Sequence, residues 1–301
     1  MTAIENEPLI SIIIPAYNRP KSLKSLLESV KNSSYKNIEV IISDNSRESY
    51  KEEYSDLISK YSFAKYHYNG KNLLIAGGWN KGFEESKGDL IFFCGDDYIF
   101  DKMMLNQLTK FISSNDDCGV VGPMVYYSNN EIYPPLFSIS LSTGIPLAKK
   151  YTPGVNLVHI VDGIIMIRRS LVEEAGGFDE KNFNFYLESA DLCARVRQKG
   201  YKCIILFEAK VWHDHLPRKG NMFNDPDRYK LPKAHYYLLS TKIKFIRKYA
   251  NGVQKICFFS LFLWLLIVWH GAIILFLSKQ KKREKFIMFY KGVINGIFEK
   301  L

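Results

Sequence analysis

Short apolar segments that each end at polar residues alternate with helical patterns through the first hundred residues. The β-branched run Leu9–Ile14 predicts a buried parallel strand, and Pro20 opens a pattern with apolar residues on one helix face. Ile38–Ile42 and Leu90–Cys94 predict two more buried strands. Weaker patterns predict a strand at Tyr66–Tyr68, a helix ending near Lys60 and a helix at Ala76–Ser86. This alternation indicates βαβ units and an α/β fold with a mostly parallel sheet.

Polar groups follow three of these strands. They are Tyr17-Asn18-Arg19, Asp44-Asn45 and Asp96-Asp97. Ligands of parallel sheets bind at the carboxyl ends of the strands, so these groups predict a site at that edge.

The later part of the chain has a looser pattern. Gly119–Tyr127 and Leu157–Arg168 predict strands on either side of a loop, 133–154, that is rich in Pro, Ser and Thr. We expect a short helix at Ser170–Ala175, a stronger helix at Glu188–Lys199 and a final strand at Tyr201–Phe207, leading to 211–215.

The adjacent carboxylates of Asp96 and Asp97 repel each other unless positive charge lies beside them. Hard oxygen ligands suit Mg2+ or Mn2+, which commonly bridge to substrate phosphates; a solvated turn is the alternative interpretation. His213 and His215 flank Asp214 and are either a metal or diphosphate contact or structural.

The glycines of 72–82 (NLLIAGGWNKG) lie at the predicted start of a helix, where backbone N–H groups can approach a phosphate or sugar. The segment does not match GxGxxG or GxxxxGK[ST], which argues against a dinucleotide dehydrogenase and a P-loop NTPase. The five cysteines have no CxxC spacing, and this argues against a zinc knuckle or a disulfide framework.

The positive charge is concentrated at the C-terminal end. Residues 217–301 contain 17 Lys and Arg against four acidic residues, a net charge of +13, whereas residues 1–216 sum to −3. The uncharged run 256–277 is about 33 Å long as a helix, enough to cross a bilayer, and basic clusters flank it on both sides. A single span is the first expectation. A re-entrant or surface-lying helix bent near His270-Gly271 is the alternative, because it keeps both basic clusters on the cytoplasmic face.

The N-terminal residues MTAIENEPL contain no positively charged segment of a secretory signal. We therefore expect the large domain to stay in the cytosol, at the cytoplasmic side of the cell membrane. The expected division is a catalytic domain at 1–216, basic linker helices at 217–255, and a membrane segment with a basic, amphipathic tail at 256–301.

In this order along the chain, seven motifs resemble glycosyltransferase family 2, the inverting GT-A enzymes, and in particular its rhamnosyltransferase-like branch. They are ISIIIPAYNRP (11–20), VIISDNS (40–46), the run 72–93, GDD (95–97), 162–180, 185–202 and AKVWH (209–213). The resemblance implies a GT-A fold, with a Rossmann-like mixed, mostly parallel sheet flanked by helices. The apolar C-terminal stretch adds membrane-associated helices to this expectation.

The resemblance also implies a nucleotide-diphosphate sugar as donor and Mg2+ or Mn2+ as cofactor. By position, Asp97 and His213 resemble the metal ligands, and Asp96 resembles the ribose or sugar contact. Together with the polar strand ends and the glycine segment, this predicts a nucleotide-sugar site made of Pro15, Ala16, Tyr17, Asn18, Asp44, Asn72, Gly78, Asn80 and Asp96.

An inverting transfer needs a base that deprotonates the acceptor hydroxyl. The family usually has Glu-Asp at the start of the helix near 188, with the Asp as base, whereas this chain has Glu188-Ser189. A serine cannot act as a base unaided, so Glu188 is the first candidate. Asp191, one helical turn further on, is the second.

These observations predict a membrane-associated glycosyltransferase that acts on a lipid-linked glycan or cell-surface polysaccharide, with no nucleic acid partner. One alternative is a catalytically impaired nucleotide-sugar-binding protein, which Ser189 favours. The others are a polyprenyl-phosphate glycosyltransferase and a nucleotidyltransferase. The last normally has a glycine- and arginine-rich loop after the first strand, which PAYNRPKSL lacks.

Overall fold

The computed structural model describes residues 7–133, 136–214 and 232–301. The chain divides into two compact units. The first contains residues up to 137, 148–180 and 189–217, and the second contains 138–147, 181–188 and 218–301. Each unit has its own apolar core.

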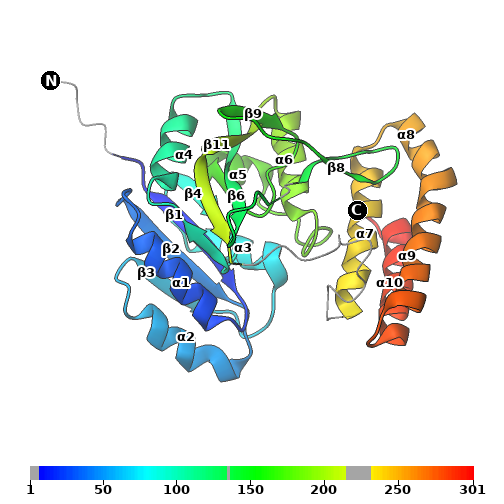
Figure 1. The fold of residues 1–301 in the computed structure, drawn as a ribbon, viewed down its shortest axis with the longest axis horizontal. Helices are drawn as coiled ribbons and strands as arrows, with labels where there is room; N and C mark the ends of the chain where they lie inside the picture. The colour runs from blue at the N-terminus through cyan, green and yellow to red at the C-terminus, as the bar shows by residue number, and fades with distance from the viewer. Residues whose placement is uncertain (1–6, 134–135, 215–231) are drawn as a thin grey trace. The chain divides into compact units, whose positions relative to one another are not determined.

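The first unit is built on a mixed sheet with the strand order β3-β2-β1-β4-β10-β6-β11-β5, in which β9 also pairs with β11 (Figure 1). The strands are β1 (Ile10–Ala16), β2 (Ile38–Asp44), β3 (Ala64–Tyr68), β4 (Leu90–Phe93), β5 (Tyr98–Phe100), β6 (Cys118–Tyr127), β9 (Val155–Val158), β10 (Ile165–Arg168) and β11 (Lys202–His213). Strands β1 to β4 pair in parallel, as do β6 and β11, whereas β5, β9 and β10 run antiparallel to their neighbours. The expected mixed, mostly parallel sheet is confirmed.

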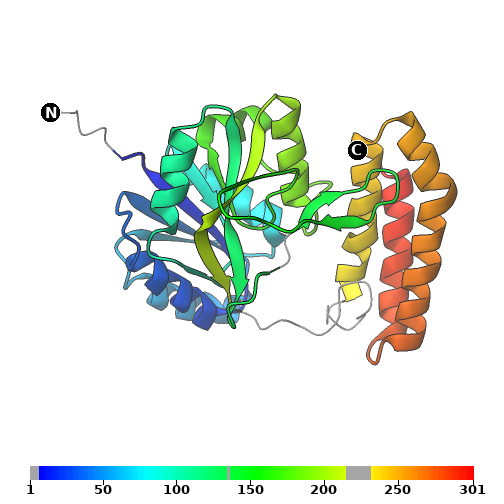
Figure 2. The ribbon, with the colours of Figure 1, turned by 45° about the horizontal axis from the view of Figure 1, so that its top comes forward.

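Helices cover both faces of this sheet (Figures 1 and 2). They are α1 (Pro20–Lys31), α2 (Lys51–Ile58) with the 3-10 turn η1 (Glu48–Tyr50), α3 (Leu74–Glu84), α4 (Met104–Ser113), α5 (Arg169–Ala175) and α6 (Glu188–Gln198). Alternate residues of β1 point to opposite faces. Ile12 and Ile14 join the core beneath α1, α2 and α4, while Ile13 joins the core beneath α3, α5 and α6.

Two expectations for the later strands are wrong. The strand expected at Leu157–Arg168 is divided into β9 and β10, because the chain turns between them at Gly163, which has a φ of +71°. The loop expected at 133–154 contains the paired strands β7 (Leu136–Ile139) and β8 (Pro146–Ala148).

The second unit contains three helical stretches: α7 (Pro232–Tyr249), a continuous stretch made of α8 (Gly252–Cys257), the π-helical turn η2 (Phe258–Phe262) and α9 (Leu263–Leu277), and α10 (Lys282–Phe298). Residues 181–188 belong to the same unit, and Phe183 packs edge-on against Phe245 of α7 at 6.2 Å between ring centroids. Gly252–Leu277 is long and apolar enough to cross a membrane, with a mean hydropathy of 2.3.

Gly82 lies where α3 crosses β1, and a Cβ there would clash with Cγ2 of Ile13. We expect Gly82→Ala to lower the free energy of unfolding by about 1–3 kcal/mol, because overpacking forces a backbone shift. Denaturant unfolding measures this. Gly252→Ala is the control, because no atom lies within 4 Å of a Cβ at that exposed position. Equal stability of the two variants would contradict the close packing of α3 on β1.

Candidate functional site

Two carboxylates directly follow β4 and lie within reach of the end of β1. Asp96 is fully buried, and its Oδ2 accepts a hydrogen bond from the backbone N–H of Tyr17 at 3.2 Å. Burial raises the pKa of Asp96 to about 6, even though the charge of Arg19 opposes the shift. Asp96 therefore remains ionised at neutral pH, in a place that favours added positive charge.

Arg19 supplies positive charge to both carboxylates. Its Nη1 donates to Oδ2 of Asp97 at 2.7 Å, and its Nη2 donates to Oδ1 of Asp96. Burial alone would lower the pKa of the guanidinium, but the two carboxylates outweigh this effect and raise it. The side chain is nonetheless 45% exposed, so Arg19 bridges the pair from the solvent side.

His213, the last residue of β11, contacts Asp97. Its Nε2 lies 3.3 Å from Oδ2 of Asp97, and its ring stacks on Tyr98 at 4.8 Å between centroids. Pairing of β11 with β5 brings them together, because His213 is in register with Tyr98. Burial and the nearby carboxylates of Asp97 and Asp162 raise the pKa of the Tyr98 phenol. His215 lies outside the described residues.

The end of β2 forms the neighbouring part of the site. Asp44 is fully buried; its Oδ1 accepts from the N–H of Ser46 at 2.8 Å, and its Oδ2 accepts from the hydroxyl of Tyr66 at 2.7 Å. Ser46 also links the two strand ends, since its Oγ accepts from the N–H of Asn18 at 2.8 Å. Asn18 has a φ of +53°, which asparagine tolerates better than most residues.

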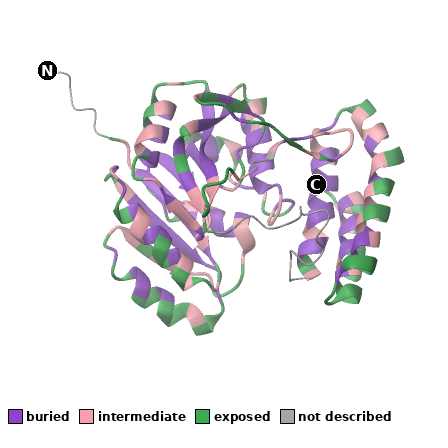
Figure 3. Cartoon of the chain, viewed as in Figure 1, coloured by how far each residue is buried: buried purple, intermediate pink, exposed green. Residues whose placement is uncertain are grey.

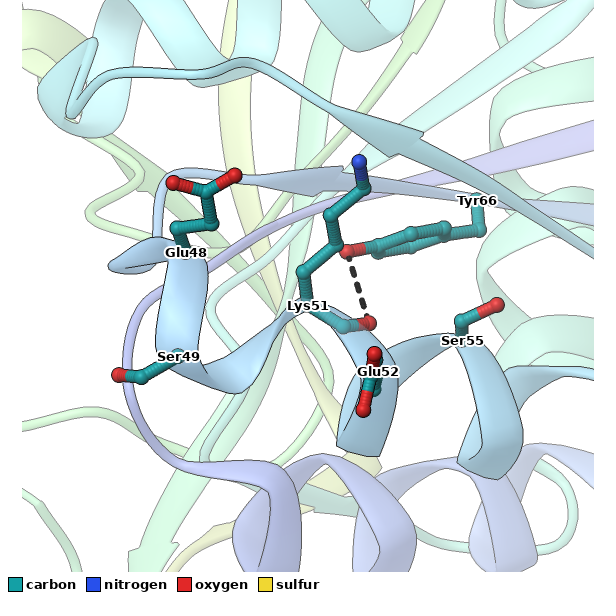
Figure 4. Close-up of a pocket in the computed structure, with 6 residues that line it drawn as sticks. All are labelled: Glu48, Ser49, Lys51, Glu52, Ser55 and Tyr66. Atoms are coloured by element: carbon teal, nitrogen blue, oxygen red, sulfur yellow. Dashed lines mark hydrogen bonds between the residues drawn. The ribbon is translucent and has the colours of Figure 1, made fainter.

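A hollow of about 620 Å3 adjoins this carboxylate (Figure 4). It is lined by Glu48, Ser49, Lys51, Glu52, Ser55 and Tyr66. The Tyr66 hydroxyl faces the backbone carbonyl of Lys51 at 3.4 Å and donates its shorter hydrogen bond to Asp44. Tyr66 therefore both lines the hollow and holds Asp44.

The predicted residues around α3 have packing contacts. Gly78 lies against β1, where a Cβ would come within 2.7 Å of Cβ of Pro15. The side chain of Asn72 accepts from the N–H of Leu74 at 2.8 Å. Asn80 exchanges hydrogen bonds with the backbone of Phe178, at 2.8 and 2.9 Å, so it fixes the turn after α5.

The two candidate bases lie in different surroundings. Asp191 is fully buried, and its Oδ2 accepts from Nε of Arg195 at 2.8 Å. Arg195 in turn donates to the carbonyls of Ala175 and Gly177. Asp191 is thus part of a structural ion pair that anchors the end of α5. Glu188 is the buried first residue of α6.

The structure therefore brings Ala16, Tyr17, Asn18, Asp44, Asp96, Asp97 and His213 to one edge of the sheet, with Pro15 next to them on β1. Sequence reasoning assigned no role to Arg19, Tyr66 or Tyr98. Arg19 stood in a polar strand end beside other candidates, whereas Tyr66 and Tyr98 had no signal, since only strand pairing brings them near the carboxylates.

Among the described residues, no group of three or more His, Cys, Asp or Glu side chains has the arrangement of a metal site. Asp97 and His213 nevertheless converge, and the carboxylate oxygen suits Mn2+ or Mg2+. Such ions are often held by one or two protein ligands together with substrate phosphates. The residues fit a cation that arrives with a phosphate ligand.

Several curated proteins are similar to this chain. The amylovoran biosynthesis glycosyltransferase AmsB of Erwinia amylovora is 26% identical over 223 residues, which cover 70% of this chain and 71% of AmsB. An uncharacterized glycosyltransferase of Haemophilus influenzae is 36% identical over 112 residues, 36% of this chain and 45% of that protein. A GalNAc(5)-diNAcBac-PP-undecaprenol beta-1,3-glucosyltransferase of Campylobacter jejuni is 31% identical over 96 residues, 30% of each chain. The match thus spans less than half of the Haemophilus protein.

Solved structures share the fold. The mannosyltransferase PcManGT of Pyrobaculum calidifontis, in complex with GDP-Man and Mn2+, superposes with a TM-score of 0.63 at 13% identity, over 99% of this chain and 89% of that one. S. aureus TarS 1-349, in complex with UDP-GlcNAc, gives 0.63 at 14% identity, over 95% and 81%. These likenesses confirm the expected GT-A-like fold. Residues 11–176 match the model of the family described as Glycosyl transferase family 2, so this chain belongs to that family of glycosyltransferases.

Proposed function

We propose that this glycosyltransferase is metal-dependent and inverting, and that it transfers a sugar from a nucleotide-diphosphate sugar to a lipid-linked glycan or cell-surface polysaccharide at the cytoplasmic side of the cell membrane. The observation that carries the proposal is the convergence of Asp96, Asp97, Arg19 and His213 at the carboxyl edge of the sheet, beside Asp44. Two similar proteins, by their names, make amylovoran or act on an undecaprenol-linked glycan.

The nucleotide would bind along the ends of β1 and β2. Asp44 has carboxylate lone pairs beyond those that Ser46 and Tyr66 use, and these can accept from a ribose hydroxyl or a base N–H. Asp96 would make the second ribose or sugar contact. PcManGT and TarS were solved with GDP-Man and UDP-GlcNAc, and these are the two nucleotides to test first.

Asp97 and His213 would hold Mn2+ or Mg2+ together with the diphosphate. When bound, the ion would neutralise negative charge on the leaving nucleoside diphosphate. Arg19 already pairs with the two carboxylates and is exposed enough to turn toward a phosphate. A guanidinium binds phosphate through two parallel hydrogen bonds, so Arg19 can exchange one anionic partner for another.

Glu188 would act as the general base. Its carboxylate takes the proton of the acceptor hydroxyl while the acceptor oxygen attacks the anomeric carbon, and the bond from that carbon to the phosphate oxygen breaks. A single displacement of this kind inverts the configuration at the anomeric carbon. Asp191 is less suited to this role, because it is bound to Arg195.

Glu188→Gln tests the base. We expect turnover to fall about 10²–10⁴-fold with little change in nucleotide-sugar affinity, because general base catalysis contributes about this factor. Steady-state kinetics with calorimetry on the same samples separate the two effects. Asp191→Asn is the control: it loses the Arg195 ion pair and some stability but retains turnover per folded molecule. Full activity in Glu188→Gln would refute the assignment. Nucleotide-sugar binding without turnover in the wild type would favour a binding protein instead.

Arg19→Ala tests the competition between guanidinium and metal. We expect Mn2+ affinity in the absence of nucleotide to rise about tenfold or more, because the carboxylates lose their cation. Electron paramagnetic resonance of free Mn2+ measures this directly. The backbone N–H of Arg19 keeps its bond to Tyr54, so the turn should survive. Lys21→Ala removes an exposed charge two residues away, in α1, and should leave the affinity unchanged. An unaltered affinity in Arg19→Ala would show that Arg19 does not compete for this site.

Tyr66→Phe tests the nucleotide pocket. The variant removes the hydrogen bond to Asp44, and we expect the free energy of unfolding to fall by about 1–3 kcal/mol, as for hydrogen bonds to charged groups. Nucleotide affinity should weaken in parallel, because the carboxylate is no longer held in one orientation. Tyr68→Phe, two residues along β3, is the matched control. If both variants behave alike in unfolding and in calorimetry, Tyr66 has no special role.

A further inference from the structure

One side of the long helical stretch Gly252–Leu277 is covered by protein along its length. Residues of α7, of the long stretch and of α10 form one core, which contains Leu239, Ile243, Ile246, Ala250, Phe258, Leu263, Ile274, Phe289 and Val293. Nδ1 of His235 in α7 lies 3.3 Å from Nε2 of His270 in α9. The stretch is thus one member of a three-helix assembly and does not stand alone (Figure 2).

The other side of the stretch is an apolar stripe that no described residue covers. Ile256 is 71% exposed, Val268 70% and Phe276 80%, and the row extends from one end of the stretch to the other (Figure 3). Its large apolar members are Val253, Ile256, Leu261, Trp264, Leu265, Val268, Trp269, Leu275, Phe276 and Leu277. Only 28% of the apolar window is buried. Exposed apolar surface of this extent marks a docking face.

The charges around this stripe select an anionic lipid surface as its partner. Residues 232–301 contain thirteen lysines and arginines against two glutamates. Four of the basic residues, Lys279, Lys281, Lys282 and Arg283, are exposed at the turn where the stretch ends. Two tryptophans, Trp264 and Trp269, lie on the stripe itself and are 59% and 58% exposed. Aromatic and basic residues of this kind favour the headgroup boundary.

The neighbouring helices decide how the stretch meets the lipid. An upright stretch would carry α7 and α10 into the hydrocarbon with it, because both pack along its covered side. Lys291 is exposed halfway along α10, and Arg247 and the Lys244–Glu299 ion pair lie where α7 meets α10. Charged groups at that depth are costly in lipid. When the stretch lies flat, only the stripe enters the lipid, and the charges stay at the level of the headgroups.

We propose that Gly252–Leu277 lies parallel to the membrane plane, with its stripe in one leaflet of an anionic bilayer, and does not cross the bilayer. This rests on the membrane association proposed above and adds its geometry. Both basic ends of the stretch then face the same aqueous compartment, as the surface-lying alternative from the sequence requires.

Depth measurements on the full chain test the geometry. Single cysteines replace Ile256, Val268 and Phe276 in a Cys257→Ser background and carry a fluorophore, and the protein is added to vesicles of phosphatidylcholine and phosphatidylglycerol. Quenching by lipids with shallow and deep spin labels gives the depth of each site. We expect three equal, shallow depths. A spanning stretch would place Val268 near the bilayer centre and the other two near opposite surfaces, because about 30 Å separates Ile256 from Phe276; this result would overturn the proposal.

An impermeant maleimide gives a second readout. Gly252→Cys and Gln280→Cys are exposed at the two ends of the stretch. Both should react from outside preformed vesicles if the stretch lies flat, whereas protection of one end would contradict this.

Removing phosphatidylglycerol should weaken vesicle binding about tenfold or more, because several basic residues approach the surface. Absence of binding to any vesicle, with a stable dimer in analytical ultracentrifugation, would assign the stripe to a second copy of the chain. That result would overturn both the geometry and the membrane association, but it would leave the metal and nucleotide tests unaffected.

Discussion

The site depends on two adjacent carboxylates at the end of a buried strand. Asp96 and Asp97 cannot both be ionised there without positive charge beside them. Arg19, in the turn after β1, supplies that charge, and His213 of β11 lies beside Asp97. Asp96 is fully buried, and this burial raises its pKa to about 6. The site is therefore arranged around unfavourable negative charge, which a cation with a diphosphate can relieve.

This arrangement explains why the sheet must be mixed. The parallel strands β1, β2 and β4 bring Tyr17, Asp44 and the carboxylate pair to one edge. The histidine arrives on β11, which pairs there with β5, the strand directly after Asp97. A purely parallel βαβ sheet would supply the first three groups without the last.

Much of the fold could be predicted from the sequence where one physical signal dominated. The buried runs before Ala16, Asp44 and Gly95 predicted β1, β2 and β4, because fully buried parallel strands are continuously apolar. The helices α1, α3 and α6 followed from apolar spacing and lie within a few residues of their expected bounds. Strands β5, β7 and β8 were not predicted, since each has only three or four residues and depends on distant partners.

The candidate site, like the fold, could be predicted only in part. Residues at strand ends were predicted correctly as neighbours, because topology alone brings the carboxyl ends together. The environment of each side chain was not predictable: Asn80 fixes a turn 98 residues away, and Asp191 is bound to Arg195. The C-terminal stretch shows a further limit. Its composition is apolar all round, yet only burial distinguishes the side that packs on α7 and α10 from the exposed stripe.

The most direct test of the central claim is a thermal-shift panel of UDP, GDP and their sugars, with and without Mn2+, on the wild type and on Asp97→Ala. A ligand that binds only the folded state raises the melting temperature according to its affinity. The account predicts a rise for one nucleotide series that requires Mn2+ in the wild type and disappears in Asp97→Ala. An equal rise in the variant, or one that is independent of Mn2+, would contradict it.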